Sequence, residues 1–321
     1  MIRHPYWLLL AAALAFPRAA PADQISVTHW GVLMYGVPYA VAMEKGFFRE
    51  GGVDIDGILT SKGGGTTVRN VLAGGLPYGE VSLAAAVAAA RQGIDIRIVN
   101  AGARTVHEIL WVTMPDSPYK SLKDLAGKKV AYTSPKSVTD MLLLMALDKV
   151  GMKPDSVERV VTGGIGAGLT ALEKGGVAAA PTMDPVWART HDKYRPLFWV
   201  KDLLPPMTQT VGITTPEFAA KHPDKLRAII AARRKAVDYV YANPGLATAS
   251  FAAAYNLPPE VAATAVKNMI AVRFWSPGNF EMEGLDRMIA GLRIVGEVEG
   301  PVDWSKLVDE RFLPPDLRSK K

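Results

Sequence analysis

The chain has 321 residues, of which 49% are hydrophobic and 21% are charged, which is the composition of an ordinary globular protein. This length suits two lobes of about 100 to 200 residues each, large enough to bury a core without covalent staples. The sequence contains no cysteine, which excludes disulfides, thiol nucleophiles and thiolate metal sites.

The net charge of +6 at pH 7 is not concentrated in one region. Basic residues cluster only at 233–235 and in the last four residues, and elsewhere they are mixed with acids. This distribution is typical of a solvated helix face and a chain end, and it argues against a nucleic-acid-binding surface.

Residues 1–22 are predicted to be a secretory signal peptide. A basic start at Arg3 is followed by an apolar run over 7–16 and by the small-residue pattern Ala20-Pro21-Ala22. The apolar run is too short to span a bilayer, which disfavours the alternative of an uncleaved anchor. No cysteine follows it to carry a lipid. We therefore expect cleavage after Ala22 and a free protein in the periplasm of a bacterium with two membranes.

Strands and helices alternate through the first third of the chain. Strands are predicted at 25–28, 53–60, 94–103 and 108–114, and helices at 39–48 and 67–73. The segment that starts at Leu76 is predicted as a short connection leading into an alanine-rich helix, which ends at Gly93.

The pattern restarts at Pro115 and changes after residue 215. The predicted elements are a short helix and strand within 121–134, a helix at 137–151, a strand at 157–163, a helix at 167–176 and strands at 177–183 and 209–215. After residue 215 the chain is predicted to be helical. This alternation favours parallel α/β sheets with helices on both faces. We expect a discontinuous first lobe of 23–113 and 208–321 and a second lobe of 114–207, with crossings near 113–114 and 207–210.

Five segments in order resemble one family. They are "PYAVAMEKGFFREGGVDID", "GGGTTVRNVLAGGLPYGEVSLAAAVAAARQGIDIRIV", "SLKDLAGKKVAYTSPKSVTDMLLLMAL", "ALEKGGVAAAPTMDPVWA" and "PEFAAKHPDKLRAIIAARRKAVDYVYANP". The chain resembles the periplasmic substrate-binding proteins of ABC importers for nitrate, sulfonates, taurine and pyrimidine precursors (NitT/TauT-like). The resemblance implies an α/β, type II-like fold of two lobes with a hinge, a ligand cleft between the lobes and a helical C-terminal part.

The resemblance also implies a function. Such a protein binds a small solute by closing its lobes and delivers it to a permease in the inner membrane. We expect a monomer that is not an enzyme and that needs no cofactor, metal or nucleic acid. Two alternatives stay open: a sensory subunit that presents ligand to a receptor, and an enzyme similar to the pyrimidine-precursor synthases. The second alternative is disfavoured because those synthases carry a cysteine-rich iron motif.

Candidate ligand contacts come from the rule that ligands bind beyond the carboxyl ends of the strands. The residues selected are His29, Trp30, Tyr35, Gly65, Thr66, Thr67, Ser82, Ser134, Ser137, Thr139 and Asp184. The rule places them in loops of both predicted lobes, so that a ligand held by them would bridge the lobes.

Each candidate also has a structural interpretation. Hydroxyls at predicted helix N-termini suit an anion, or they cap the helix without a ligand. The rings of Trp30 and Tyr35 stack on a planar ligand or belong to the core. His29 is a ligand contact or a loop residue, and Asp184, which precedes a proline, is a ligand contact or part of a turn. We predict a neutral-to-basic cleft with aromatic walls and a small organic anion, with a planar ring if the aromatic residues contact it.

Other chemistries lack their motifs. The run "GGIGAG" at 163–168 has Leu169 where a dinucleotide-binding loop needs its last glycine. The sequence has no phosphate-binding loop, no H-E-x-x-H and no G-x-S-x-G. We therefore assign no catalytic residue and no metal ligand.

Overall fold

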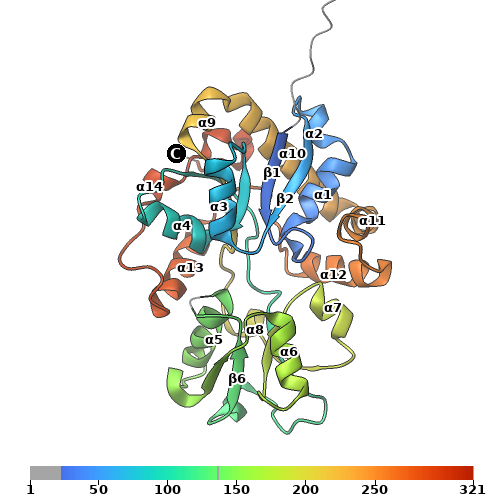
Figure 1. Ribbon diagram of the computed structural model, residues 1–321, viewed down its shortest axis with the longest axis vertical. Coiled ribbons are helices and arrows are strands. Elements are labelled where there is room, and N and C mark those ends of the chain that lie inside the picture. Colours follow the sequence, from blue (N-terminus) through green and yellow to red (C-terminus); the bar gives the residue numbers. More distant parts are fainter. Residues whose placement is uncertain (1–22, 136, 321) are drawn as a thin grey trace, which may run out of the picture.

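The computed structural model describes residues 23–135 and 137–320, which form two α/β lobes of unequal size. Figure 1 shows the larger lobe above the smaller one, with extended segments running between them. The predicted signal peptide, residues 1–22, lies outside the described residues. Within the described part, none of the helices has both the length and the apolar character needed to cross a membrane.

The larger lobe is built on a mixed sheet with the strand order β2-β1-β3-β10-β4. Strands β1 (Asp23–Thr28), β2 (Ile55–Ser61) and β3 (Gly79–Ser82) are parallel. Strand β10 (Thr210–Thr214) returns from the smaller lobe and lies antiparallel between β3 and β4 (Arg97–Ala101). The sequence predicted parallel sheets, and this inserted strand makes the sheet mixed.

Strand β3 was predicted as a connection, and that prediction is wrong. Its first residue, Gly79, lets helix α3 (Gly64–Ala73) approach closely, because a Cβ there would lie 2.7 Å from the Val71 side chain and 3.0 Å from Thr67. A four-residue strand that starts with glycine has few of the features by which strands are predicted from sequence. Its place in the middle of the sheet is set by tertiary packing.

The smaller lobe contains an antiparallel sheet of order β8-β5-β9 and a parallel pair β6-β7. The strands are β5 (Leu110–Thr113), β8 (Ala180–Thr182), β9 (Arg195–Trp199), β6 (Lys129–Tyr132) and β7 (Glu158–Val161). A parallel bridge from Val130 to Ala179 links the two groups. Since β5 pairs here, the first crossing lies between β4 and β5, earlier than the predicted 113–114.

Helices cover the sheets and make up most of the chain after β10. The larger lobe carries α1 (Val37–Glu44), α2 (Phe47–Glu50), α3, α4 (Leu83–Arg91), α9 (Pro216–Lys221), α10 (Pro223–Ala242), α11 (Pro244–Tyr255), α12 (Pro259–Ala271), α13 (Met282–Ile294) and α14 (Trp304–Leu307). The smaller lobe carries α5 (Val138–Lys149), α6 (Ile165–Glu173), α7 (Val186–Thr190) and α8 (Val200–Leu203).

The two lobes meet at two helix contacts, visible at the left and right of Figure 1. On one side α5 packs on α13, where Gly291 leaves room for the thioethers of Met141 and Met145; a Cβ on this glycine would lie 2.5 and 2.7 Å from the two sulfurs. On the other side α7 packs on α12. There the Asn268 amide donates a hydrogen bond of 3.0 Å to Asp184 Oδ2.

Candidate functional site

The carboxyl ends of the central strands of the larger lobe lie together. Thr28 at the end of β1 is in register with Ser61 at the end of β2, and Val27 is in register with Glu80 of β3. Helix α3 follows β2 and helix α4 follows β3 directly. The predicted ligand loops of this lobe therefore share one edge of the sheet.

At this edge Thr67 is a structural residue. Its side chain is fully buried, and its hydroxyl shares hydrogen bonds of 2.6 Å with the hydroxyls of Thr28 and Ser61. Thr66 is half-buried and accepts a hydrogen bond of 2.9 Å from Arg69. Gly65 is exposed in the first turn of α3. The two threonines predicted as a pair thus differ, since the Thr67 hydroxyl is already engaged by two partners.

The serines at helix starts act as caps. Ser82 Oγ accepts a hydrogen bond from the Ala85 amide at the start of α4, and Ser137 Oγ accepts one from the Asp140 amide at the start of α5. These contacts match the N-cap interpretation.

The Ser137 hydroxyl also belongs to a cluster with Thr139 and Thr133, joined by hydrogen bonds of 2.8 to 3.0 Å. Thr133 was not among the predicted residues. Ser134 is exposed beside them.

The predicted aromatic residues follow β1 and pack against aromatic residues of the helical C-terminal part. Trp30 packs edge-to-face on Tyr255 at 5.1 Å between ring centroids, and Tyr35 stacks on Phe274 at 6.0 Å. Both rings keep part of their surface accessible. The adjacent His29 has a positive φ of 56°, and burial lowers the pKa of its imidazole, which favours the neutral ring.

Glu80 and Arg233 form a buried ion pair, and both side chains are 1% exposed. Glu80 Oε2 accepts hydrogen bonds from Tyr39 at 2.5 Å and from Arg233 at 3.2 Å, and Oε1 accepts one from Thr210 at 2.7 Å. The guanidinium also donates to the carbonyls of Ser276 and Gly102. Every charged atom of this cluster has a partner, so Glu80 is structural.

A second buried carboxyl, Glu108, has incomplete hydrogen bonding. Glu108 Oε1 accepts a hydrogen bond of 3.0 Å from Gln209 Nε2. Within the described part of the chain, Glu108 Oε2, Gln209 Oε1 and the hydroxyl of Thr182 are buried without any hydrogen-bond partner. The three side chains are 4%, 2% and 0% exposed. Unpaired buried polar groups are costly in native proteins and call for an explanation.

These three residues come from the two crossings and the smaller lobe. Glu108 lies between β4 and β5, Gln209 immediately precedes β10, and Thr182 ends β8 opposite Leu110 of β5. Asp184, two residues further on, accepts hydrogen bonds from the Ala188 amide and from Asn268 of the larger lobe. The unpaired atoms are thus positioned where the two lobes join.

Burial raises the pKa values of the two acids at this junction. Burial, with the nearby charge of Asp184, raises the pKa of Glu108 to about 8. Burial raises the pKa of Asp184 to about 6, although the Asn268 and Ala188 hydrogen bonds oppose this shift. Burial and the charge of Glu108 also raise the pKa of Tyr35. The junction therefore holds two buried acids that keep their protons to a higher pH than exposed carboxyl groups do.

Sequence reasoning missed Glu108, Gln209 and Thr182 because it searched the loops that follow strands. Two of the three lie in the crossings, which the sequence analysis located only approximately. Two other polar residues of the first crossing have structural partners. Arg104 forms an ion pair with Glu281, and the His107 ring is hydrogen-bonded to the Leu204 carbonyl. The only sequence feature that could have pointed to them is that polar residues, Glu108 and Gln209, occur in the segments that cross between the lobes.

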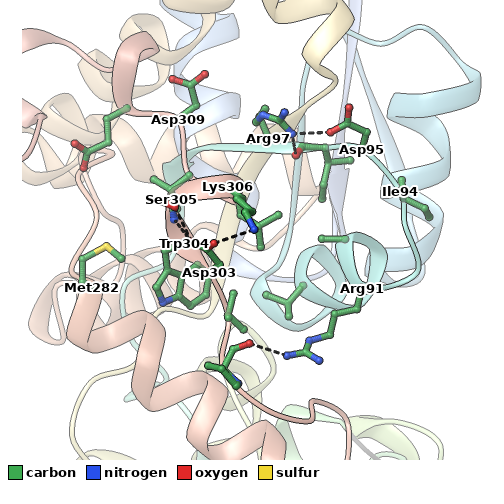
Figure 2. A pocket seen from close by; sticks show the side chains of 18 of the residues that line it. Arg91, Ile94, Asp95, Arg97, Met282, Asp303, Trp304, Ser305, Lys306 and Asp309 are labelled. Carbon is green, nitrogen blue, oxygen red and sulfur yellow. Dashed lines mark hydrogen bonds and ion pairs between the residues drawn. The ribbon is translucent and has the colours of Figure 1, made fainter.

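A wide hollow of about 1640 Å³ lies elsewhere, between α4, the turn before β4 and the segment around α14. Figure 2 shows that its charged side chains pair locally: Arg97 with Asp95, and Lys306 with Asp303. Its lining contains none of the predicted ligand residues. Among the described residues, no group of three or more His, Asp or Glu is placed to hold a metal ion.

Comparison with solved structures defines the class of fold. The aliphatic sulphonate binding protein SsuA of Escherichia coli superposes with a TM-score of 0.75 at 19% identity, covering 94% of this chain and 96% of SsuA. The nitrate-binding protein NrtA of Synechocystis PCC 6803 gives 0.66 at 14% identity, covering 92% and 87%. The chain has the periplasmic-binding-protein fold, as the sequence predicted.

The sequence comparisons then identify the family. The model of the family described as NMT1/THI5 like matches residues 34–247. That is more than half of the chain, so the protein belongs to the NMT1/THI5-like family. A curated protein of Brucella abortus (strain 2308), named as a binding protein, is 28% identical over 249 residues, which is 74% of each chain. The resemblance that was inferred from the quoted segments is confirmed.

Proposed function

We propose that this protein is the periplasmic solute-binding component of an ABC import system. It binds a small organic ligand between its lobes and delivers it to a permease in the inner membrane, without chemical change to the ligand. The family and the binding proteins that share its fold support this role. The proposed lobes are 23–113 with 208–321 and 114–207, with residues 110–113 moved to the smaller lobe because β5 pairs there.

The observation that carries the proposal is the set of unpaired buried atoms where the lobes join. Glu108, Gln209 and Thr182 supply them from the two crossings and from the smaller lobe. A ligand that pairs with these atoms gains interactions in the closed arrangement, and differential interaction of this kind shifts a two-lobed protein toward closure.

A solute screen tests the proposal. Residues 23–321 are purified without ligand, shown to be folded by circular dichroism, and tested by thermal shift and calorimetry against a library of acidic, neutral and basic metabolites. We expect at least one solute to bind one-to-one and to reduce the radius of gyration in X-ray scattering. A folded protein that binds no member of the library would overturn the role, as would consumption of a bound solute detected by mass spectrometry.

Export and transport are tested separately. We propose that residues 1–22 are removed and that the mature chain is a free periplasmic monomer, which cell fractionation, N-terminal sequencing and light scattering check. The alternative sensory role predicts that deletion of the gene abolishes a response to the solute while its uptake continues.

A further inference from the structure

The unpaired atoms at the lobe junction have a defined hydrogen-bonding character. When Glu108 is ionised, its Oε2 atom is an acceptor. Gln209 Oε1 is also an acceptor, because the Gln209 amide nitrogen already donates to Glu108 Oε1. The Thr182 hydroxyl accepts or donates. A partner that satisfies two buried acceptors must carry hydrogen-bond donors.

The charged groups around Glu108 reinforce this requirement. Asp184 adds a second buried carboxyl, and the charge of Glu108 contributes to the raised pKa of the Tyr35 phenol. The neighbouring cation Arg104 is neutralised by Glu281. Burial lowers the pKa of His107, and the His107 ring bonds the Leu204 carbonyl.

His191 also influences Asp184, where its charge opposes the rise of the Asp184 pKa, and its ring bonds the Ala188 carbonyl. A carboxylate or sulfonate placed against the ionised forms of Glu108 and Asp184 would therefore meet like charge.

We propose that the cleft selects a small organic ligand bearing N–H donors, an amine, amidine or amino-substituted ring, whose donors are received by Glu108, Gln209 and Thr182. This inference rests on the proposed binding function and specifies its ligand class. It replaces the organic anion that the sequence led us to expect. Tyr35, whose pKa the charge of Glu108 raises, keeps part of its ring accessible, and such a ring suits a planar ligand.

A series of probes with one ring and different polar groups tests the ligand class. Benzamidine and benzamide offer N–H donors, whereas benzoate and benzenesulfonate offer only acceptors. Binding to residues 23–321 is measured by ligand-observed NMR and calorimetry at pH 8. We expect benzamidine to bind at least tenfold more tightly than benzoate or benzenesulfonate.

Matched variants locate the donor site. Glu108→Gln removes the unpaired carboxylate oxygen and is expected to weaken benzamidine binding at least tenfold. Glu217→Gln changes an exposed acid of α9 that pairs with Lys221, and it should leave binding unchanged. Circular dichroism and thermal melts confirm that both variants are folded.

The pH dependence gives a second readout. Because Glu108 is protonated below a pKa of about 8, a cationic donor must displace that proton to bind. Affinity for benzamidine should then rise by up to about tenfold per pH unit between pH 6 and 8, and Glu108→Gln should flatten the profile. A flat wild-type profile would contradict a contact with Glu108.

The outcomes separate this inference from the proposed function. Benzoate or benzenesulfonate binding more tightly than benzamidine, or benzamidine binding that Glu108→Gln leaves unchanged, overturns the donor-bearing ligand while the binding function stands. If no probe binds, the solutes of the library decide: a bound amine or amidine supports the inference, and a bound acid overturns it. Failure of every probe and every solute overturns the binding function itself.

Discussion

Two buried carboxyl groups of this protein differ in how fully they are paired. Glu80 is 1% exposed, and its oxygens accept hydrogen bonds from Tyr39, Thr210 and Arg233. Glu108 is 4% exposed, and its hydrogen bond from Gln209 leaves one oxygen unpaired. Burial alone therefore does not distinguish the two sites, but hydrogen-bond completeness does.

This difference suggests a structural role for the Glu80 cluster and a ligand-binding role for the Glu108 cluster. The Glu80–Arg233 cluster links α1, β3, β10 and α10, and it is complete within the described chain. The Glu108 cluster leaves three buried atoms without partners at the junction of the lobes. A complete cluster stabilises the fold, whereas an incomplete one reduces stability in a way that a ligand can reverse.

The largest effect is expected from breaking the complete cluster. Arg233→Leu leaves the Glu80 carboxylate buried without its cation, so we expect a loss of about 3 to 5 kcal/mol in the free energy of unfolding. Urea denaturation followed by circular dichroism measures it. Arg234→Leu, which changes the neighbouring half-buried arginine, is the control and should cost about 0 to 1 kcal/mol. Equal effects of the two variants would remove the distinction drawn for Glu80.

The incomplete cluster should make the free energy of unfolding decrease as the pH rises. The folded pKa of Glu108, about 8, exceeds its ordinary value of 4.5, so the folded state binds more protons between these values. This contribution to stability is present in full below pH 4.5 and is lost as pH rises through 8, at up to about 1.4 kcal/mol per pH unit.

Asp184, with a folded pKa of about 6 against 3.8, adds a similar decline at lower pH. Urea denaturation at pH 4, 5, 6, 7 and 8 measures the combined slope. Glu108→Gln should be less sensitive to pH than the wild type and at least as stable at pH 8. A wild-type slope that survives Glu108→Gln unchanged would assign the effect to other groups.

Replacement of a buried threonine by valine can be compared between the two clusters, at Thr210 in the complete cluster and at Thr182 in the incomplete one. Thr210 is 1% exposed, and its hydroxyl donates to Glu80 and accepts from the Ala103 amide at 2.6 Å. Thr210→Val leaves both partners unsatisfied, so we expect a loss of about 1 to 3 kcal/mol in the free energy of unfolding. Thermal denaturation and urea titration measure the loss.

Thr182→Val is the counterpart in the incomplete cluster. The Thr182 hydroxyl is buried without a partner, so its replacement by a methyl group breaks no hydrogen bond. We expect the free energy of unfolding without ligand to change by no more than about 0.5 kcal/mol, or to increase, while affinity for a donor-bearing ligand falls. A cost comparable to that of Thr210→Val would show that the hydroxyl is paired in solution.

The sequence predicted the fold better than the site. Helix periodicity, glycine stops and the five quoted segments were sufficient for the two-lobed class, but the short strand β3 depends on tertiary packing and was missed. Loops after strands led to Ser82 and Ser137, which cap helices, and to Thr67, which is buried against two hydroxyls. Glu108 and Gln209 lie in crossing segments, where local pattern gives no information on which side chains will be left unpaired.

The position of β10 has a consequence for the order of folding. Thr210 pairs with Ser82, which precedes it by 128 positions in the sequence, and Val211 pairs with Ala101. The sheet of the larger lobe therefore stays open, with the edges of β3 and β4 unpaired, until the whole smaller lobe has been synthesised. Such non-local pairing is slow to form, and unpaired strand edges are prone to aggregate. The smaller lobe, continuous in sequence, can form first and shorten the search by bringing β10 back toward β3.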